Sequence, residues 1–278
     1  MRTVSKPTEL TKLVLEQRAN GCSVALIPTM GNLHDGHLSL VKKAREENDF
    51  VVVSIFVNPI QFGPNEDYNS YPRTLDADVE KIKQYCDLVF APSVKDMYGE
   101  TGRSNLIITE TEKAIQLCGR FRPGHFEGVL TVVLKLFNIC LPNTAYFGSK
   151  DYQQFVLIKD MAAELNLDVK IIGCPIVREA DGLAMSSRNS YLGTEQRKRA
   201  LALSQSLNMV KEIFVTGEKN VDTLKEKALE LLVPKVAVQY FEVVDSESLK
   251  TVKTAKKGDL VAVAAFCDKV RLIDNIVL

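Results

Sequence analysis

One segment limits the possible folds more than any other, because residues 50–57 form an almost unbroken run of β-branched and aromatic residues. A strand of this composition is apolar on both faces, which is typical of a parallel sheet that helices cover on both sides. Four further apolar runs alternate with amphipathic segments, at residues 23–29, 88–90, 143–147 and 169–177. The alternation predicts a doubly wound α/β sheet.

The segments between these strands have the composition of helices. We expect helices at residues 8–19, 38–48, 75–85, 129–140 and 152–165. Thr8 is the expected N-cap of the first helix. The helix at 129–140 is apolar almost all round and is therefore expected to be buried. The region after Pro92 is less regular, with a predicted strand at 105–109 and a helical turn or two at 112–117.

The character of the chain changes after Gly193. Amphipathic helices are expected at 194–215 and 221–232, and extended runs at 238–244, 260–266 and 270–276. This order predicts a Rossmann-like doubly wound parallel sheet over residues 1–184 and a smaller α+β domain over residues 185–278. No long linker separates the two domains, so we expect a cleft between them.

Composition excludes several classes of protein. The 35 Lys and Arg residues balance 35 Asp and Glu residues, so no global basic field favours nucleic acid or an anionic membrane. The six cysteines are scattered without a Cys-x-x-Cys pair, which argues against a zinc ribbon or a disulfide scaffold and predicts buried, reduced thiols. We find no signal-peptide pattern and no apolar run long enough to span a membrane, and we expect a cytoplasmic protein.

The segment 28–37 carries the clearest chemistry, because it joins a predicted strand to a predicted helix. Gly31 and Gly36 allow a ligand to approach the backbone closely. The helix start behind them offers N–H groups and a positive dipole end, which favour phosphate. His34 and His37 are two of the three histidines in the chain. The alternative is a pair of surface histidines that cap the helix.

Three other loops at strand ends carry polar clusters, and ligands of doubly wound sheets bind beyond the carboxyl ends of strands. The clusters are Asn58 with Gln61, residues 148–151 and residues 185–188. The Walker A and Gly-x-Gly-x-x-Gly motifs are absent, so a nucleotide site here belongs to another class. Each cluster alone has an ordinary alternative, since amides such as Gln61 and Gln154 are often exposed. Likewise, Lys150 beside Asp151 is a common solvated helix start, and residues 186–189 can be a capping loop. Cys118 is expected to be inert, and His125 to order its own loop.

The pairing of His34-Asp35-Gly36-His37 with Met185-Ser186-Ser187-Arg188 resembles the nucleotidylyltransferase superfamily. In more detail, the chain resembles the pantothenate synthetase (pantoate–β-alanine ligase) family. The segments that carry this resemblance are 28–31, 34–37, 56–62, 71–74, 122–126, 147–154 and 185–189, with residues 240–245 as a less specific addition.

The resemblance implies an ATP-dependent ligase that makes pantothenate in two steps. The carboxylate of pantoate attacks the α-phosphorus of ATP to give pantoyl adenylate and pyrophosphate, and the amine of β-alanine then displaces AMP. The implied partners are the small molecules pantoate, β-alanine and ATP, with Mg²⁺ on the phosphates and no assigned protein ligands for it. A homodimer is also implied, and shielding of the adenylate from water favours closure of the C-terminal domain as a lid.

The same resemblance assigns roles to individual residues. His37, His34, Lys150 and Arg188 are the implied catalytic residues, and whether His37 donates a proton or only charge stays open. Gln61 and Gln154 are implied to bind pantoate, and Gln61 also β-alanine. The implied ATP contacts are Met30, Gly31, Asn32, Leu33, His34, Asp35, Gly36, His37, Gly148, Ser149, Lys150, Asp151, Val177, Met185, Ser186, Ser187 and Arg188.

Position 149 departs from the family pattern, which usually has Glu where this chain has Ser149. The change removes a carboxylate beside Lys150, and we expect only the backbone role to persist. Two rival functions stay open at this stage. One is a nucleotidyltransferase that moves AMP or CMP onto a phosphorylated small molecule, which leaves Gln61 and Gln154 unexplained. The other is an RNA-binding, synthetase-like module, which the zero net charge disfavours.

Overall fold

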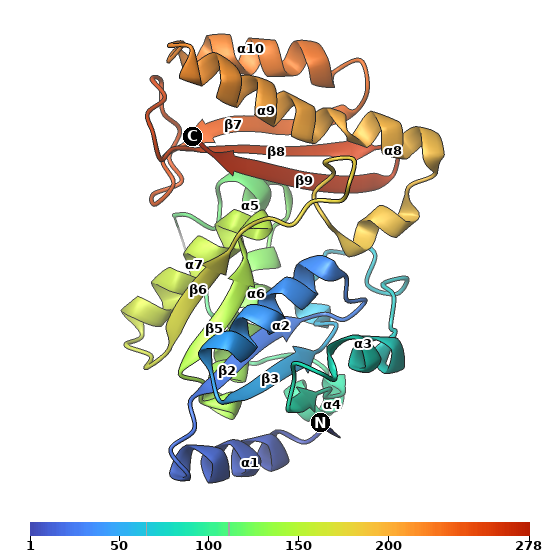
Figure 1. Ribbon diagram of the computed structural model, residues 1–278, viewed down its shortest axis with the longest axis vertical. Coiled ribbons are helices and arrows are strands. Elements are labelled where there is room, and N and C mark those ends of the chain that lie inside the picture. Colours follow the sequence, from blue (N-terminus) through green and yellow to red (C-terminus); the bar gives the residue numbers. More distant parts are fainter. Residues whose placement is uncertain (65, 111) are drawn as a thin grey trace. The chain divides into compact units, whose positions relative to one another are not determined.

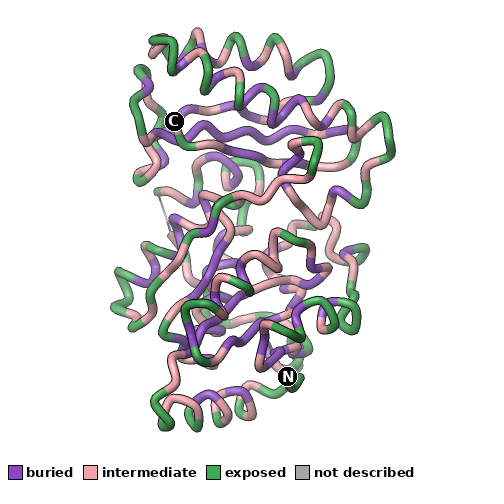
Figure 2. The backbone as a smooth tube through the Cα atoms, in the orientation of Figure 1, coloured by how far each residue is buried: buried purple, intermediate pink, exposed green. Residues whose placement is uncertain are grey.

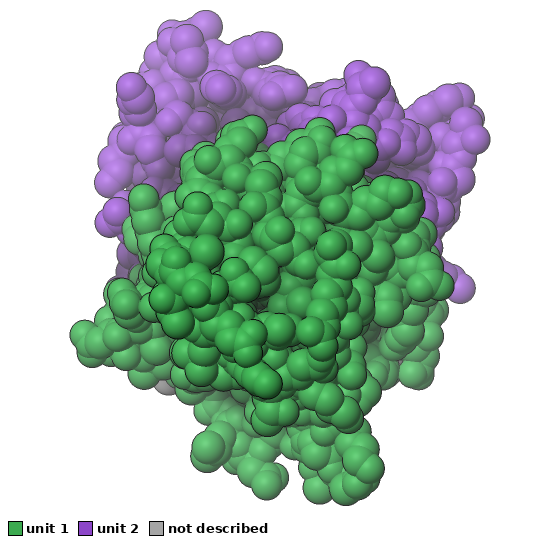
Figure 3. Space-filling model, turned by 60° about the horizontal axis from the view of Figure 1, so that its bottom comes forward, with its two compact units in different colours: residues 1–111, 122–149, 154–175 green, residues 112–121, 150–153, 176–278 purple. Residues whose placement is uncertain are grey.

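The computed structural model describes residues 1–64, 66–110 and 112–278. The chain forms two compact units, which Figure 3 colours separately. The first unit comprises residues 1–111, 122–149 and 154–175, and the second comprises residues 112–121, 150–153 and 176–278.

The first unit is built on a six-stranded parallel sheet in the order β1-β4-β3-β2-β5-β6. The strands are β1 (Arg2–Val4), β2 (Val24–Thr29), β3 (Phe50–Ile55), β4 (Leu88–Phe90), β5 (Thr144–Gly148) and β6 (Lys170–Cys174). The prediction of a doubly wound parallel sheet is confirmed. β1 was not predicted, because only one of its three residues, Val4, is apolar and buried, whereas all three residues of β4 are.

Helices cover this sheet on both faces, as the apolar strands require (Figure 1). α2 (Asp35–Glu47) packs over β2, β3 and β5, where Ile27 and Val53 belong to one core with Val41 of the helix. The alternate residues Leu26 and Val52 point to the other face and are fully buried as well. On that face α1 (Pro7–Ala19) and α6 (His125–Cys140) contact β2 and each other. Most of β2 and β3 is therefore buried, as the tube of Figure 2 shows for the centre of this sheet. The remaining helices are α3 (Leu75–Ile82), α4 (Val94–Tyr98) and α7 (Tyr152–Glu164).

The predicted strand at residues 105–109 is wrong, because this segment has no regular structure. Its apolar side chains are exposed, with Leu106 at 84% and Ile107 at 56%, and the Ile108 N–H donates to Thr131 Oγ1 at 3.0 Å instead of to a strand. A β-branched sequence forms a strand only where a neighbour completes its hydrogen bonds. The predicted helical turn at 112–117 is also misplaced, because α5 spans Leu117–Phe121.

Two helix starts differ from the prediction for identifiable reasons. α1 begins at Pro7 with Lys6 rather than Thr8 at the N-cap, since proline is preorganised for the first helical position and needs no donor there. α2 begins at Asp35, three residues earlier than predicted, so His34 occupies its N-cap. The predicted helix at 194–215 is divided at Leu201 into α8 (Thr194–Ala200) and α9 (Ala202–Val215).

The second unit contains an antiparallel sheet in the order β7-β8-β9, as predicted from three extended runs. The strands are β7 (Ala237–Val244), β8 (Leu260–Cys267) and β9 (Val270–Val277). α9 and α10 (Val221–Leu232) lie side by side on this sheet and share one core with it (Figure 1). The prediction that the smaller domain has an α+β fold is thus confirmed.

The predicted buried, reduced thiols are confirmed for five of the six cysteines, while Cys22 is half-buried; all six are free. Within the described ranges, no helix combines the length and the apolar character that a bilayer crossing would need.

Candidate active site

The segment after β2 makes a tight left-handed turn before α2 begins. Gly31 has φ +82° and Asn32 has φ +50°. A Cβ on residue 31 would lie 3.1 Å from both Asp78 Oδ2 and Ile55 Cγ2, so only glycine fits this conformation without displacing its neighbours. Thr29 completes the turn, since its hydroxyl donates to the Ser54 carbonyl at 2.7 Å and accepts from the Gly31 N–H at 3.3 Å.

A buried carboxylate on α3 holds this turn from inside. Asp78 is 1% exposed, and its two oxygens accept the backbone N–H groups of Asn32 at 2.9 Å and Leu33 at 2.7 Å. The Thr74 hydroxyl donates to the same carboxylate at 3.1 Å, and Lys81 Nζ donates to the Leu33 carbonyl at 2.6 Å. Sequence reasoning missed Asp78. No local signal distinguishes it from the other acidic residues of α3, because only the fold shows that it points inward.

His34 and His37 form a contacting pair at the start of α2. Their ring centroids are 4.1 Å apart at an interplanar angle of 41°. The His34 N–H donates to His37 Nδ1 at 3.3 Å, which leaves Nε2 as the protonated nitrogen of a neutral His37 ring. The capping alternative from the sequence is therefore realised in part, since His34 does occupy the N-cap. A capped start of this kind also fixes the direction of both rings relative to the helix N-terminus.

Gln61 is not a surface amide, because it is 8% exposed. It ends the 3-10 turn η1 (Pro59–Gln61), and Asn58 Nδ2 donates to both its Oε1 and the Gly128 carbonyl at 3.0 Å. The Tyr98 hydroxyl donates to Asn58 Oδ1 at 2.8 Å, and burial raises the pKa of Tyr98, so this donor stays neutral. Gln61 Nε2 then points at Met30 Sδ, 3.1 Å away, which brings an expected pantoate residue beside an expected ATP residue.

Sheet topology explains why these loops share one edge. β2 pairs with β3 on one side and with β5 on the other, and all three strands are parallel. Their carboxyl ends carry, respectively, the histidine turn, η1, and the segment that starts at Gly148. The chain order reverses about β2, and such a switch point is where doubly wound sheets bind ligands.

Gly148 and Ser149 lie in the first unit, and the predicted ATP residues after them, Lys150, Asp151, Val177 and 185–188, lie in the second. The Met185 N–H donates to the Val177 carbonyl at 3.0 Å, and Ser186 Oγ accepts the Arg188 N–H at 3.2 Å as N-cap of η3 (Ser187–Tyr191). Lys150 Nζ lies 3.4 Å from Asp151 Oδ2. The backbone carbonyl of Lys150 accepts a hydrogen bond from Asn275 Nδ2 at 2.8 Å.

Ion pairs hold the loop at residues 178–189, which contains these groups. Arg178 pairs with Asp274 through two contacts of 2.6 and 3.0 Å, and the Asp274 side chain is 2% exposed. Arg197 pairs with Glu179 at 2.5 Å and with Asp181 at 2.8 Å. The hydrogen bond from Arg197 lowers the pKa of Asp181, and Glu179 raises that of Arg197. Asn189 Nδ2 closes the loop by donating to Glu179 Oε1 at 2.6 Å.

The predicted residues therefore form two groups, one in each unit. Gln154 is half-buried on α7 in the first unit. Cys118 is buried in the second unit with Sγ 3.1 Å from the Tyr240 hydroxyl. In the parts of the chain that the structure describes, no three His, Cys, Asp or Glu side chains gather as a possible metal site.

Comparison with known proteins places this geometry in a family. A family model described as Pantoate-beta-alanine ligase matches residues 2–277. A pantothenate synthetase from Thermotoga neapolitana is 51% identical over 281 residues, covering 100% of both chains. A pantothenate synthetase structure from Thermus thermophilus has a TM-score of 0.93 and 43% identity, covering 99% of each chain.

A pantoate–beta-alanine ligase structure from Francisella tularensis, complexed with beta-gamma ATP and beta-alanine, has a TM-score of 0.80 and 37% identity, covering 100% of this chain and 97% of that one. The chain shares its fold with these two structures, and its parallel sheet carries a His-x-Gly-His turn at the switch point. These features define an α/β ligase of the nucleotidylyltransferase type. The chain belongs to the pantoate–beta-alanine ligase family.

Proposed function

We propose that this chain condenses pantoate with β-alanine at the expense of ATP, through a pantoyl adenylate. In the first step an oxygen of the pantoate carboxylate bonds to the α-phosphorus, and pyrophosphate leaves. In the second step the β-alanine nitrogen bonds to the acyl carbon, loses a proton, and AMP leaves. The observation that carries this proposal is the histidine turn, which Asp78 fixes at the switch point of the sheet. The similar structure of the Francisella tularensis ligase, which is complexed with beta-gamma ATP and beta-alanine, also supports the proposal.

The first unit supplies the proposed pantoate contact and one part of the ATP contact. Because Gln61 Oε1 already accepts a hydrogen bond from Asn58 Nδ2, the Gln61 amide offers Nε2 as a donor to an oxygen of pantoate. Gln154 is proposed as the second pantoate contact. His34 and His37 are proposed to face the phosphates, where a ring N–H donor stabilises the charge that develops as pyrophosphate leaves. Residues 30–33, 35, 36, 148 and 149 complete the ATP contacts proposed for this unit.

The second unit supplies the proposed cationic contacts. Lys150 and Arg188 are the positive groups for the phosphates, and Ser186 and Ser187 add hydroxyl donors. Asp151, Val177 and Met185 are the remaining ATP contacts of this proposal. We propose that Mg²⁺ accompanies ATP, where it would neutralise part of the phosphate charge and would need few protein ligands.

We also propose an oligomeric state, a location and a division into domains for this chain. The first is a homodimer, for which molar mass from light scattering on a sizing column is the test. The second is a cytoplasmic location. The third is the division into a domain at 1–184 and a lid at 185–278, which stays a prediction of the sequence.

The products test the proposed reaction. The full chain is incubated with ATP, Mg²⁺, β-alanine and pantoate that carries ¹⁸O in its carboxylate, and products are analysed by mass spectrometry. We expect pantothenate, pyrophosphate and AMP, with one ¹⁸O transferred to AMP. Formation of ADP and phosphate, or AMP without ¹⁸O, contradicts an acyl adenylate. The rival nucleotidyltransferase reaction requires a phosphorylated acceptor and gives no pantothenate.

A further inference from the structure

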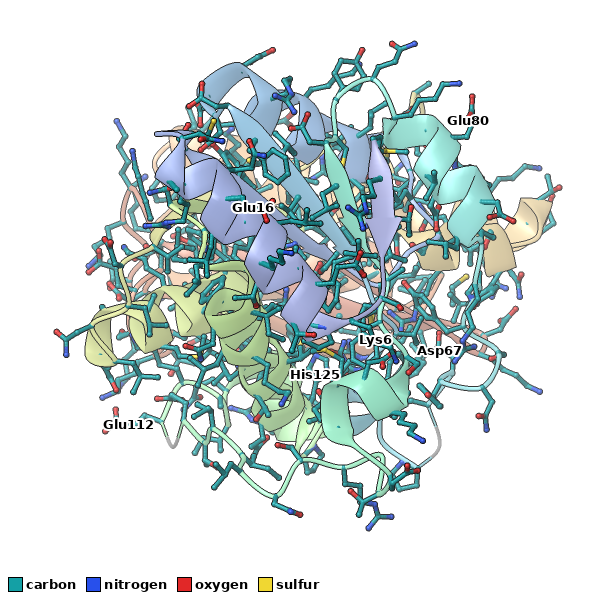
Figure 4. The ribbon with its side chains drawn as sticks, turned by 90° about the horizontal axis from the view of Figure 1, so that it is seen from below. Lys6, Glu16, Asp67, Glu80, Glu112 and His125 are labelled. Carbon is teal, nitrogen blue, oxygen red and sulfur yellow. The ribbon has the colours of Figure 1, made fainter. Side chains whose placement is uncertain are left out.

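The backbone of η1 is wedged against α6, and a glycine makes the contact possible. A Cβ on Gly128 would lie 2.4 Å from the Ile60 carbonyl oxygen and 2.6 Å from Gln61 Cα. The position of Gln61 is therefore set by where α6 begins and how its first turn is oriented. His125 is the first residue of α6 and is labelled in Figure 4.

A chain of polar contacts runs from the half-buried carboxylate of Glu66 to the backbone of Gln61. Arg122 makes a two-pronged pair with Glu66, with Nε and Nη2 each 2.6 Å from a carboxylate oxygen. The third arm of the guanidinium, Nη1, lies 2.9 Å from His125 Nε2. His125 Nδ1 lies 2.8 Å from the Gln61 carbonyl oxygen. All four residues belong to the first unit.

The chemistry of the two ends fixes the proton on His125. Arg122 has only donors, so Nε2 must accept from it. The Gln61 carbonyl has only an acceptor, so Nδ1 must carry the hydrogen. Only the neutral Nδ1–H ring satisfies both contacts, since a doubly protonated ring would set an N–H against the guanidinium. Burial alone would raise the pKa of Glu66, but its hydrogen bond and charge interaction with Arg122 lower it, so Glu66 stays ionised and keeps Arg122 in place.

We propose that His125 is a positioning residue for pantoate: it fixes the backbone of Gln61, and through it the side-chain amide, by the contacts Glu66–Arg122–His125–Gln61. The inference rests on the proposed function and deepens it. The Gln61 amide is held at Oε1 by Asn58 and at its backbone by His125, so its Nε2 keeps one direction. Fixed donors of this kind lower the ordering cost of binding an oxygen ligand.

Three substitutions at one position separate the two contacts of the ring. Asn places an N–H near the Nδ1 position, Gln places its amide near the Nε2 position, and Phe keeps only the ring shape. Steady-state kinetics with the full chain give separate KM values for pantoate and ATP. We expect His125→Phe and His125→Gln to raise KM for pantoate about tenfold, the scale of one lost hydrogen bond, and His125→Asn to raise it less than about threefold. KM for ATP is expected to move less than about twofold in all three.

Arg45→Lys is the matched control, because Arg45 also lies in the first unit, where it pairs with the Asp87 carboxylate and donates to the backbone carbonyls of Asp49 and Tyr85. It is expected to leave both KM values unchanged. An unchanged KM for pantoate in His125→Phe overturns the inference. An equal rise of the KM for pantoate in His125→Asn and His125→Gln overturns it as well. Parallel rises in both KM values show general damage and also overturn it. A wild-type chain without pantoate-dependent turnover fails the proposed function itself, before any variant is compared.

Discussion

Two segments proposed to contact ATP are held in opposite ways. The turn at residues 28–37 is fixed by neutral backbone N–H groups on one carboxylate, Asp78, that is 1% exposed. The loop at residues 178–189 is fixed by ion pairs from Arg178 and Arg197, whose side chains are 28% and 32% exposed. Water and salt reach both arginines and the two carboxylates that pair with Arg197, whereas Asp78 and Asp274 are kept from them.

The buried contacts make the histidine turn rigid, and the partly exposed ion pairs leave the loop at residues 178–189 adjustable. Removing a buried carboxylate that accepts several N–H groups is strongly destabilising, because each of these N–H groups is then buried without a hydrogen-bond partner. Partly exposed ion pairs are weak singly and are screened by salt. We therefore expect the histidine turn to keep its shape under all solution conditions that keep the first unit folded, and the loop to respond to salt and pH.

The largest effect is expected at Asp78. Asp78→Ala leaves the N–H groups of Asn32 and Leu33 without their acceptor, and we expect a loss of about 3 kcal/mol in the free energy of unfolding. Urea unfolding followed by circular dichroism measures the loss. Asp76→Ala is the control, because Asp76 lies in the same first turn of α3 but is exposed. A loss no greater than that of the control contradicts the role of Asp78.

A smaller loss is expected at Arg178. Arg178→Ala removes the partner of Asp274, whose side chain is 2% exposed, and we expect about 2 kcal/mol of destabilisation. Unfolding curves recorded on the full chain give the value. Arg199→Ala, which breaks an exposed pair with Asp268, serves as the reference and should destabilise the chain clearly less than Arg178→Ala. Equal costs for both variants would remove the distinction between a buried and an exposed carboxylate.

Arg197→Ala is expected to have a still smaller effect, about 1 kcal/mol or less, since all three of its ion-pair side chains are partly exposed. The effect should shrink when NaCl is raised to about 0.5 M, whereas that of Asp78→Ala should not. Hydrogen exchange at the amides of residues 178–189 reports the change locally. Salt-independent exchange in this loop would count against the contrast between the two segments.

The smallest effect is a pH dependence. Because the pKa of Asp181 is lowered in the folded chain, its contribution is fully present above the ordinary Asp pKa and is lost as pH falls through the folded value. Between about pH 5 and about pH 3 the stability difference between wild type and Arg197→Ala should therefore narrow. A difference that stays constant over this range, in parallel urea titrations, would show that Asp181 does not titrate in this pair.

Regular elements were predictable wherever local pattern and tertiary context agree. β4 and α10 lie within the predicted bounds, and the apolar runs of β2 and β3 indicated the parallel sheet. The segment 105–109 failed because strand formation there needed a neighbour that the local pattern does not report. The sequence also pointed to the histidine turn but not to what holds it. Asp78 holds that turn through the direction of its side chain, which no short window of sequence contains. The sequence placed Asn58 beside Gln61 at a strand end, but it did not show the contact between them or the Tyr98 hydroxyl behind Asn58.

We propose that an acyl adenylate forms on this chain at the histidine turn. Exchange of labelled pyrophosphate into ATP, measured without β-alanine, tests it most directly, because the first step must be reversible on its own. We expect exchange that requires pantoate and that falls at least tens-fold in His37→Ala, on the scale of a lost electrostatic or acid–base group. Exchange that proceeds equally without pantoate, or that is unchanged in His37→Ala, would contradict it.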